Sequence, residues 1–307
     1  MTTETITSPA SRPTEKAAIC CIGHITLDRV ITPEFDLYMP GGTAYYFAKA
    51  LESLDHRDFR LVTAVGASEK GVAEELRREG IEVTVLPSRQ SVFFENRYGK
   101  DRNERTQRVL AKADPFTIDS LRGMEANIFH LGTLLSDDFG LDVIKYLSER
   151  GAVSVDVQGY LRKVEGENVV HVDYADKREA MRYISVLKAN EKEMEVLTGR
   201  RDALEAALEL ASWGCPEVVL TLGDRGSVIC HEGEFHEIPA YKTREVVDTT
   251  GCGDTYMAGY LYKRAHGADC TSAGKFAAAM CTLKLEGKGP FSGSLTDIER
   301  LLAQTTL

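Results

Sequence analysis

The chain has 307 residues, of which 43% are hydrophobic and 27% are charged, a composition ordinary for a globular protein. Its 37 Lys and Arg residues are outnumbered by 47 Asp and Glu residues, and the net charge of −10 argues against nucleic acid or an anionic membrane surface as the main partner. A small anionic ligand stays compatible with this charge, because a local group of backbone amides binds phosphate even on an acidic protein.

The first residues indicate where the domain begins, and the cysteines indicate the cellular compartment of the protein. Residues 1–16 are polar and rich in Thr and Ser, so we expect a disordered leader ahead of a single domain over 17–307. Seven cysteines, without CxxC spacing, favour reduced thiols and a cytoplasmic location over a disulfide framework or a zinc site. No apolar stretch is long enough to cross a bilayer.

Short apolar runs alternate with segments of helical periodicity along the chain. The predicted strands are 17–23, 59–66, 127–135, 152–159 and 183–190, with further strands in 217–238. The predicted helices are 41–54, which opens on a glycine pair, then 69–79, 141–150, 254–266 and 271–286. This alternation predicts an α/β fold with a doubly wound, mostly parallel sheet.

The segment 81–99 has a different pattern. It contains IEVTVLPS and SVFFENRYG, which alternate and are rich in β-branched and aromatic residues. We expect exposed antiparallel strands there. Together with 29–40, the segment 81–110 would form a small β flap, or lid, on the main sheet.

The stretch VVDTTGCGDTYMAGYLYKRA (246–265) joins a strand-like run to a helix. Gly251 and Gly253 let the backbone approach a ligand closely. A helix that begins near Asp254 presents unpaired N–H groups and a positive dipole end, which together favour an anion. Asp254 is placed to take a proton from a hydroxyl that attacks phosphorus. Taken alone, Asp254 is better explained as a helix N-cap and the glycines as a tight turn.

Within this stretch, DTTGCGD resembles the C-terminal signature D-T-x-G-A-G-D of the ribokinase-like (PfkB) family of carbohydrate and nucleoside kinases, with Cys252 where Ala is usual. Earlier segments are similar to other family motifs in the same order. They are GHITLD with Asp28, the pair Gly41-Gly42, VGASEKG with Ser68 in place of an acid, NEKE with Asn190 and Glu193, and TLGDRGS at 221–227. The resemblance covers about 17–290 and implies a ribokinase-like fold.

The resemblance implies a kinase that uses ATP and Mg²⁺. Asp254 would be the catalytic base, and the amides of Gly251, Cys252 and Gly253 would form an anion hole. Asn190 and Glu193 would act on Mg²⁺ through water, although a helix-start cap explains the pair as well. The remaining donor-side residues would be Thr221, Gly223 and Gly226 along the ATP phosphates or ribose, 277–289 beside adenine, and Asp248 and Thr250 at a monovalent-cation (K⁺) site found in some relatives.

On the acceptor side, the resemblance places Asp28, Gly41 and Gly42 around the sugar. Tyr46 stands where an Asn is usual, and a phenol cannot supply the paired donor and acceptor of an amide. Further expected contacts are Gln107 on the flap, and Asp156 and Gln158 at the end of a strand, where ligands bind in open α/β sheets. Arg97 and Arg108 would also be within reach of the acceptor, and Arg162 of a phosphate, although each is more simply interpreted as a solvated charge.

Only a dozen residues separate Asp28 from Gly41, too few for the full lid strands of typical ribose kinases. The flap would then come mainly from 81–99. A short lid weakens any prediction of a lid-to-lid dimer, so a monomer and a homodimer both stay open.

Three hypotheses follow for the function. The first is an ATP-dependent kinase of a hydroxyl on a small sugar or polyol. The second keeps the family and changes the acceptor to a nucleoside, with Tyr46 stacked on the base, or to an inositol. The third is a non-catalytic sugar or nucleotide sensor, although a sensor would have no need of a base such as Asp254.

Overall fold

The computed structural model describes residues 16–54, 58–98 and 105–304, so all of the expected leader except Lys16 lies outside the described residues. Most of the described strands form one large sheet. In spatial order they are β15 (Glu234–Ile238), β14 (Ser227–His231), β13 (Glu217–Thr221), β12 (Val186–Asn190), β9 (Ala152–Asp156), β8 (Ala126–Gly132), β1 (Ala17–Gly23), β4 (Phe59–Val65) and β5 (Glu82–Pro87). Only the pairings of β14 are antiparallel, which confirms the predicted mostly parallel sheet.

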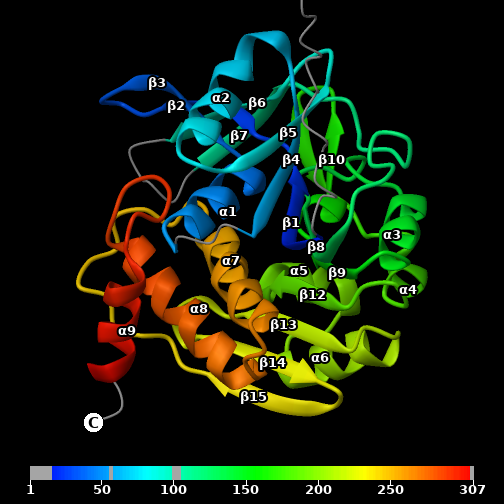
Figure 1. Cartoon of the computed structure of the whole chain (residues 1–307), viewed down its shortest axis with the longest axis vertical. Helices are drawn as coiled ribbons and strands as arrows, with labels where there is room; N and C mark the ends of the chain where they lie inside the picture. Colours follow the sequence, from blue (N-terminus) through cyan, green and yellow to red (C-terminus); the bar gives the residue numbers. More distant parts are fainter. Residues whose placement is uncertain (1–15, 55–57, 99–104, 305–307) are drawn as a thin grey trace, which may run out of the picture.

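Helices cover both faces of this sheet (Figure 1). One face carries α1 (Thr43–Glu52), α2 (Lys70–Arg78), α7 (Cys252–Ala265), α8 (Cys270–Leu285) and α9 (Leu295–Gln304). The other carries α3 (Leu141–Ser148), α4 (Lys177–Ala180), α5 (Glu191–Thr198) and α6 (Ala203–Ser212). Successive side chains of β1 alternate between the two cores, with Ile19 in the first and Cys20 in the second. This two-sided burial confirms the doubly wound architecture.

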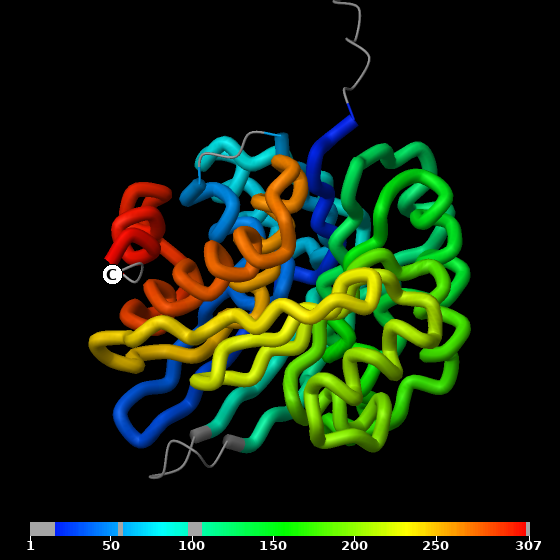
Figure 2. Tube along the Cα trace, turned by 90° about the horizontal axis from the view of Figure 1, so that it is seen from below, coloured from blue at the N-terminus to red at the C-terminus, as the bar shows by residue number. Residues whose placement is uncertain are grey.

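A smaller sheet stands beside the carboxyl end of β1. In spatial order its strands are β10 (Arg162–Glu165), β11 (Asn168–His171), β7 (Arg105–Ala111), β6 (Val92–Tyr98), β2 (Thr26–Ile31) and β3 (Asp36–Gly41). Figure 2 shows the β2–β3 hairpin and the β6–β7 pair running out together on one side of the molecule. We refer to this sheet as the flap. A small core of its own, which includes Val92, Phe94 and Val109, holds it together.

Two details of the flap differ from the expectation. Residues 82–87 form β5, which pairs in parallel with β4 at the edge of the large sheet and not with the flap. An edge strand with one covered face has the same alternation of burial as an antiparallel strand, so the pattern could not separate the two. The β10–β11 hairpin was not predicted, because its charged sequence RKVEGEN lacks the apolar alternation of a strand.

Among the described residues, no helix is both long enough and apolar enough to span a membrane.

Candidate active site

The predicted polar side chains gather where parallel strands of the large sheet end. Asp156 is the last residue of β9, Asn190 of β12 and Thr221 of β13. The register pairs Asn190 with Thr221, and Lys188 with Asp156, so these residues lie along one edge. This edge is where ligands bind in open α/β sheets.

The turn of residues 251–254, named the anion turn below, leads into α7. Gly251 is the N-cap at φ +74°, and the helix begins at Cys252, two residues before the expected start. The Cys252 N–H donates to the Thr249 carbonyl at 3.3 Å, so this amide is already engaged and does not fit the predicted anion hole as well as its neighbours. The N–H groups of Gly253 and Asp254 belong to the first helical turn, which lacks intrahelical acceptors.

Asp254 lies in that first turn with its carboxyl half-buried and hydrogen-bonded to Thr43. Burial, and after it the nearby Asp156, raise the pKa of Asp254 from 3.8 to about 7, against the opposing effects of Lys188 and Thr43. Thr43 is held at this point because α1 begins directly over Gly132, where a Cβ would come within 2.5 Å of the Thr43 methyl. A carboxyl with a pKa near neutrality is suited to exchange protons at physiological pH.

A buried lysine lies beside the anion turn. The Lys188 ammonium is 2.9 Å from Asp156 Oδ2 and 3.8 Å from Glu193 Oε2. A Cβ on Gly253 would lie 3.1 Å from Lys188 Nζ, so a larger residue there would crowd the ammonium. Burial lowers the pKa of Lys188, but Asp156 and Glu193 outweigh it and the pKa is raised. The lysine therefore stays protonated.

Sequence reasoning missed Lys188. The signal was available, because a single lysine in the apolar run YISVLKAN is rarely buried without a partner.

Asn190 and Glu193 form a capping box at the start of α5. The Asn190 backbone N–H and Nδ2 donate to the two Glu193 carboxylate oxygens, each at 2.7 Å. Burial raises the pKa of Glu193, partly offset by Lys188. Glu193 is poorly placed to coordinate Mg²⁺ directly, because the Lys188 ammonium lies 3.8 Å away and would repel the ion. Contact through water fits, since each carboxylate oxygen keeps a free lone pair.

The residues expected around the acceptor lie together. Asp28 accepts a hydrogen bond from Thr26 Oγ1 at 2.6 Å. A Cβ on Gly41 would lie 2.6 Å from Asp28 Oδ2. Gly42 has φ +88°, and a Cβ there would lie 2.4 Å from the His24 carbonyl. Gly41 therefore lets the chain pass directly against Asp28, and Gly42 lets it pass against the His24 carbonyl.

Tyr46 does not present its ring to open space. Its side chain is 3% exposed, and a Cβ on Gly251 would lie 2.2 Å from Tyr46 Cδ1, so the ring faces the anion turn. This packing argues against the expectation that Tyr46 stacks on a nucleobase. Burial is the main cause that raises the pKa of Tyr46. The carboxylates of Asp248, Asp28 and Asp254 raise it further, because the phenol lies near all three acids.

Besides Asp28 on β2, the flap contributes Arg162 on β10 to the surroundings of the site. Its guanidinium donates to Gln107 Oε1 and lies near enough to Glu193 to lower the pKa of that carboxyl. Gln107 Nε2 donates to Asn96 Oδ1 at 2.8 Å, so both ends of this amide bind inside the flap. Gln158 is half-buried, and its backbone N–H donates to Asp156 Oδ1 at 3.1 Å. Arg162 is thus more than the solvated charge that was expected.

The donor-side glycines have different surroundings. Gly223 has φ +61°, and a Cβ there would meet nothing within 4 Å. Gly226 has φ +87°, and a Cβ there would lie 2.0 Å from the Ile238 carbonyl. The end of β15 closes over Gly226, so its packing, rather than a ligand, explains this glycine. Its predicted contact with ATP is not favoured by this geometry.

The Lys284 ammonium lies against Asp248, one of the two residues expected at a K⁺ site. The Lys284 ammonium donates to the Asp248 carbonyl at 2.8 Å and lies 3.3 Å from Asp248 Oδ2. Asp248 also accepts hydrogen bonds from the Thr250 N–H at 2.9 Å and the Gly289 N–H at 3.0 Å. Burial opposes its charge, but these backbone bonds hold the pKa of Asp248 below its usual value.

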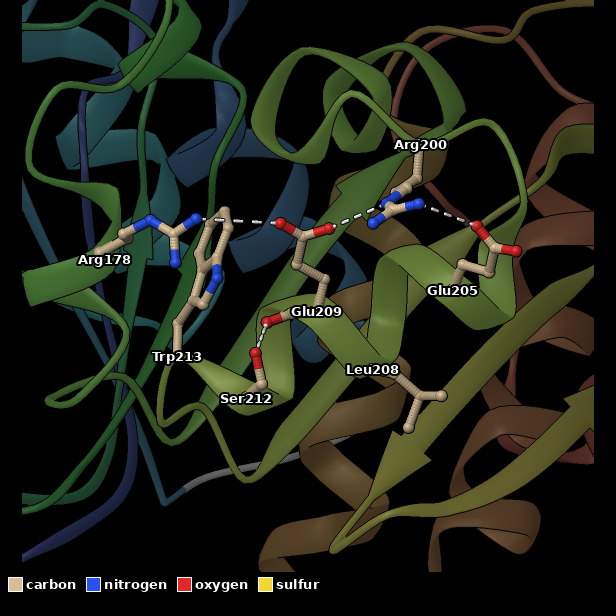
Figure 3. Close-up of a pocket in the computed structure, with 7 residues that line it drawn as sticks. All are labelled: Arg178, Arg200, Glu205, Leu208, Glu209, Ser212 and Trp213. Carbon is tan, nitrogen blue, oxygen red and sulfur yellow. Dashed lines mark hydrogen bonds and ion pairs between the residues drawn. The ribbon is translucent and has the colours of Figure 1, made fainter.

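A hollow of about 500 Å³ on the α6 side of the molecule shares no residue with this site (Figure 3). Its charged groups pair with one another. Arg200 Nε lies 3.0 Å from Glu209 Oε2, and the Arg178 guanidinium lies 4.4 Å from the centre of the Trp213 ring. The hollow offers no uncompensated group to a ligand.

The site can be compared with known proteins. A family model described as pfkB family carbohydrate kinase matches residues 16–296. Among curated proteins, the chain is 27% identical over 256 residues to a cytidine kinase of Thermococcus kodakarensis, covering 78% of this chain and 86% of that one. It is 25% identical over 294 residues to a nucleoside kinase of Methanocaldococcus jannaschii, covering 88% and 91%.

Among solved structures, a pyrophosphate-dependent kinase of the ribokinase family, in complex with a pyrophosphate analog and myo-inositol, superposes with a TM-score of 0.82. The two chains are 28% identical, and the match covers 92% of this chain and 99% of that chain. The fold, the family model and the relatives agree with one another. The chain belongs to the pfkB family of carbohydrate kinases, phosphotransferases that act on hydroxyl groups of sugars and nucleosides.

Proposed function

We propose that this chain transfers the γ-phosphoryl group of ATP to a hydroxyl of a small sugar or polyol. One observation carries the proposal: the half-buried Asp254 carboxyl, with its pKa raised to about 7, lies in the first turn of α7 beside the buried Lys188. A base and a positive field at the same point are what transfer of a phosphoryl group to an alcohol requires.

In the proposed reaction, Asp28 orients the acceptor, and Asp254 takes the proton of the attacking hydroxyl. The charge on the phosphoryl group during its transfer is stabilised by the N–H groups of Gly253 and Asp254 and by the Lys188 ammonium. Mg²⁺ bound with the donor would neutralise phosphate charge, with Asn190 and Glu193 acting on it through water. The flap, linked through Arg162 to the Glu193 region, would exclude water from the site.

The acceptor is proposed to be a polyol rather than a nucleoside because Tyr46 is closed off by Gly251. Base recognition relies on an accessible aromatic face. The similarity to a structure that holds myo-inositol supports cyclitols as the first acceptors to test.

Two specific observations favour second candidates. The similarity to cytidine and nucleoside kinases favours a nucleoside acceptor. The similarity to a pyrophosphate-dependent kinase favours pyrophosphate as the donor.

The test is a matrix of donors and acceptors, with the phosphorylated product measured by ³¹P NMR. ATP and pyrophosphate would each be combined with ribose, fructose, myo-inositol, cytidine and adenosine. We expect kcat/KM for the best polyol with ATP to exceed that of either nucleoside by about tenfold or more, the size of discrimination that one lost contact provides. A preference for a nucleoside would overturn the acceptor, and turnover with pyrophosphate alone would overturn the donor. ATP binding without any product would revive the sensor hypothesis.

A further inference from the structure

Lys284 lies in the last turn of α8, and its side chain is entirely shielded from solvent. A buried ammonium is costly unless oxygens surround it. The partners of Lys284 are the carbonyl and the carboxylate of one residue, Asp248, at 2.8 and 3.3 Å. The lysine therefore pairs with the backbone as well as with the charge of Asp248.

Asp248 fixes the approach to the anion turn. Its carboxylate accepts the N–H of Thr250, one residue before Gly251, and the N–H of Gly289 from the loop after α8. The backbone N–H of Val247 donates to the Leu285 carbonyl at 2.8 Å. The Lys284 ammonium completes this junction between the end of α8 and the segment that enters α7.

Asp248 is one of the two residues expected at a K⁺ site. An ammonium and a K⁺ ion carry the same charge and both bind oxygen, but a lysine brings its charge covalently. A K⁺ ion on the Asp248 carbonyl would lie a few ångströms from the Lys284 ammonium, where two like charges repel each other strongly in a buried setting. The two cations therefore exclude one another.

We propose that Lys284 is a positioning residue that takes the place of a monovalent cation at the anion turn, so that this chain works without K⁺. The ammonium holds the Asp248 carbonyl and, through it, the backbone that leads to Gly251 and Asp254. The expected effect of Lys284 on kcat rests on the proposed phosphoryl transfer. The expected effect of Lys284 on K⁺ binding does not depend on it.

The first experiment uses the unmodified protein. The melting temperature and, for any acceptor that is turned over, kcat are measured in KCl, NaCl and tetramethylammonium chloride at a constant ionic strength of about 0.1 M. We expect both to be the same in the three salts. Activation by K⁺, or a melting temperature raised by K⁺ alone, would overturn the proposal.

The second experiment removes the ammonium with Lys284→Met, which keeps most of the volume of the buried side chain. We expect this variant to gain a response that the unmodified protein lacks: K⁺ raises its melting temperature, and kcat recovers by on the order of tenfold as the local charge is restored. Lys275→Met is the matched control, because Lys275 lies on the same helix and is exposed. It should behave as the unmodified protein.

Each outcome decides the matter. If Lys284→Met folds with unchanged kcat, or loses activity that no monovalent cation restores, Lys284 is only part of the packing and the proposal fails. If that variant does not fold, Lys284→Gln, which keeps hydrogen-bond donors without the charge, replaces it under the same criteria. If no acceptor is phosphorylated, the melting temperatures in the three salts still decide the ion question, so failure of the proposed function would be distinguishable.

Discussion

The carboxyl of Asp254 is held in a position that costs the protein stability. Its pKa is raised from 3.8 to about 7, first by burial and then by Asp156. The folded protein therefore binds the proton more tightly than the unfolded chain does. The resulting stabilisation is fully present below pH 3.8 and is lost as the pH rises to about 7. Above that pH the folded protein carries an ionised carboxylate that its surroundings disfavour.

The variant Asp254→Asn should therefore be more stable than the unmodified protein at neutral and higher pH. We expect its free energy of unfolding to exceed that of the unmodified protein by on the order of 3 kcal/mol at about pH 8, with the difference shrinking toward pH 4. Urea denaturation across this pH range measures it. A difference that does not change with pH would mean that the carboxyl titrates normally.

Cys252 occupies the first position of α7, where a helix dipole usually favours a thiolate. Here the hydrogen bond with Cys281, followed by burial, raises the pKa of Cys252, so the thiol stays neutral. We expect Cys252→Ala to retain the turnover of the unmodified protein at a stability cost of about 1 kcal/mol. Steady-state kinetics checks this, and a loss of turnover as large as that of Asp254→Asn would reveal a chemical role for the sulfur.

Individual residues were predictable to different degrees. Asp254, Asp156 and Asn190 follow from motifs and strand ends. The structure places Asp156 and Asn190 on one edge of the large sheet, and Asp254 near enough to Asp156 for the two carboxyls to interact. The two buried lysines, Lys188 and Lys284, were missed because their importance lies in partners distant in the chain, Asp156 and Asp248. Charge pairing of this kind leaves no local pattern. An unexplained lysine in an apolar segment is the only signal that it gives.

At the scale of elements, the site depends on how closely α1 approaches the start of α7. The Tyr46 ring of α1 packs on Gly251, which has φ +74°. A side chain at this position would meet both an unfavourable backbone conformation and the ring. This contact ties the acceptor side of the site to the anion turn.

The variant Gly251→Ala separates these two effects when it is compared with Gly267→Ala. Gly267 has φ +79° at the other end of α7, but a Cβ there would meet nothing within 4 Å. We expect a loss of about 1 kcal/mol in the free energy of unfolding for Gly267→Ala, and of roughly 2–4 kcal/mol for Gly251→Ala. If thermal or urea denaturation gave equal losses of unfolding free energy for the two variants, the Tyr46 ring would move aside without an energetic cost.

Element types were more predictable than their partners. The limits of β1 agree with the prediction residue for residue, because a buried run bounded by polar residues is unambiguous. The segment 82–87 was predicted as a strand but assigned to the wrong sheet. Its alternation describes one covered face, whereas the choice of β4 as its neighbour depends on the packing of α2.

At the scale of the whole molecule, two sheets meet over the site, and Arg162 is one link between them. It extends from the flap, contacts Gln107 and lies near Glu193. The position of the flap over the strand ends could not be predicted from the sequence, because two of the five pairings among its described strands join segments far apart in the chain.

We expect Arg162→Met to loosen this link without unfolding the protein. The KM of the acceptor should rise by roughly 10- to 100-fold, the effect of losing a hydrogen bond to a charged group, while the free energy of unfolding changes little. Lys163→Met is the control, since Lys163 is the exposed neighbour in β10. Steady-state kinetics of both variants, alongside urea denaturation, makes the comparison. Equal KM values for the two variants would contradict the linking role.

The central claim is that a carboxylate and the main-chain donors at the start of α7 together transfer a phosphoryl group. The most direct measurement is the single-turnover rate of Asp254→Asn, together with its affinity for the phosphoryl donor. The account predicts a rate lowered by about 10²- to 10⁴-fold, the range for a lost general base, with donor affinity within several-fold of that of the unmodified protein. A variant that turns over at the original rate would contradict it.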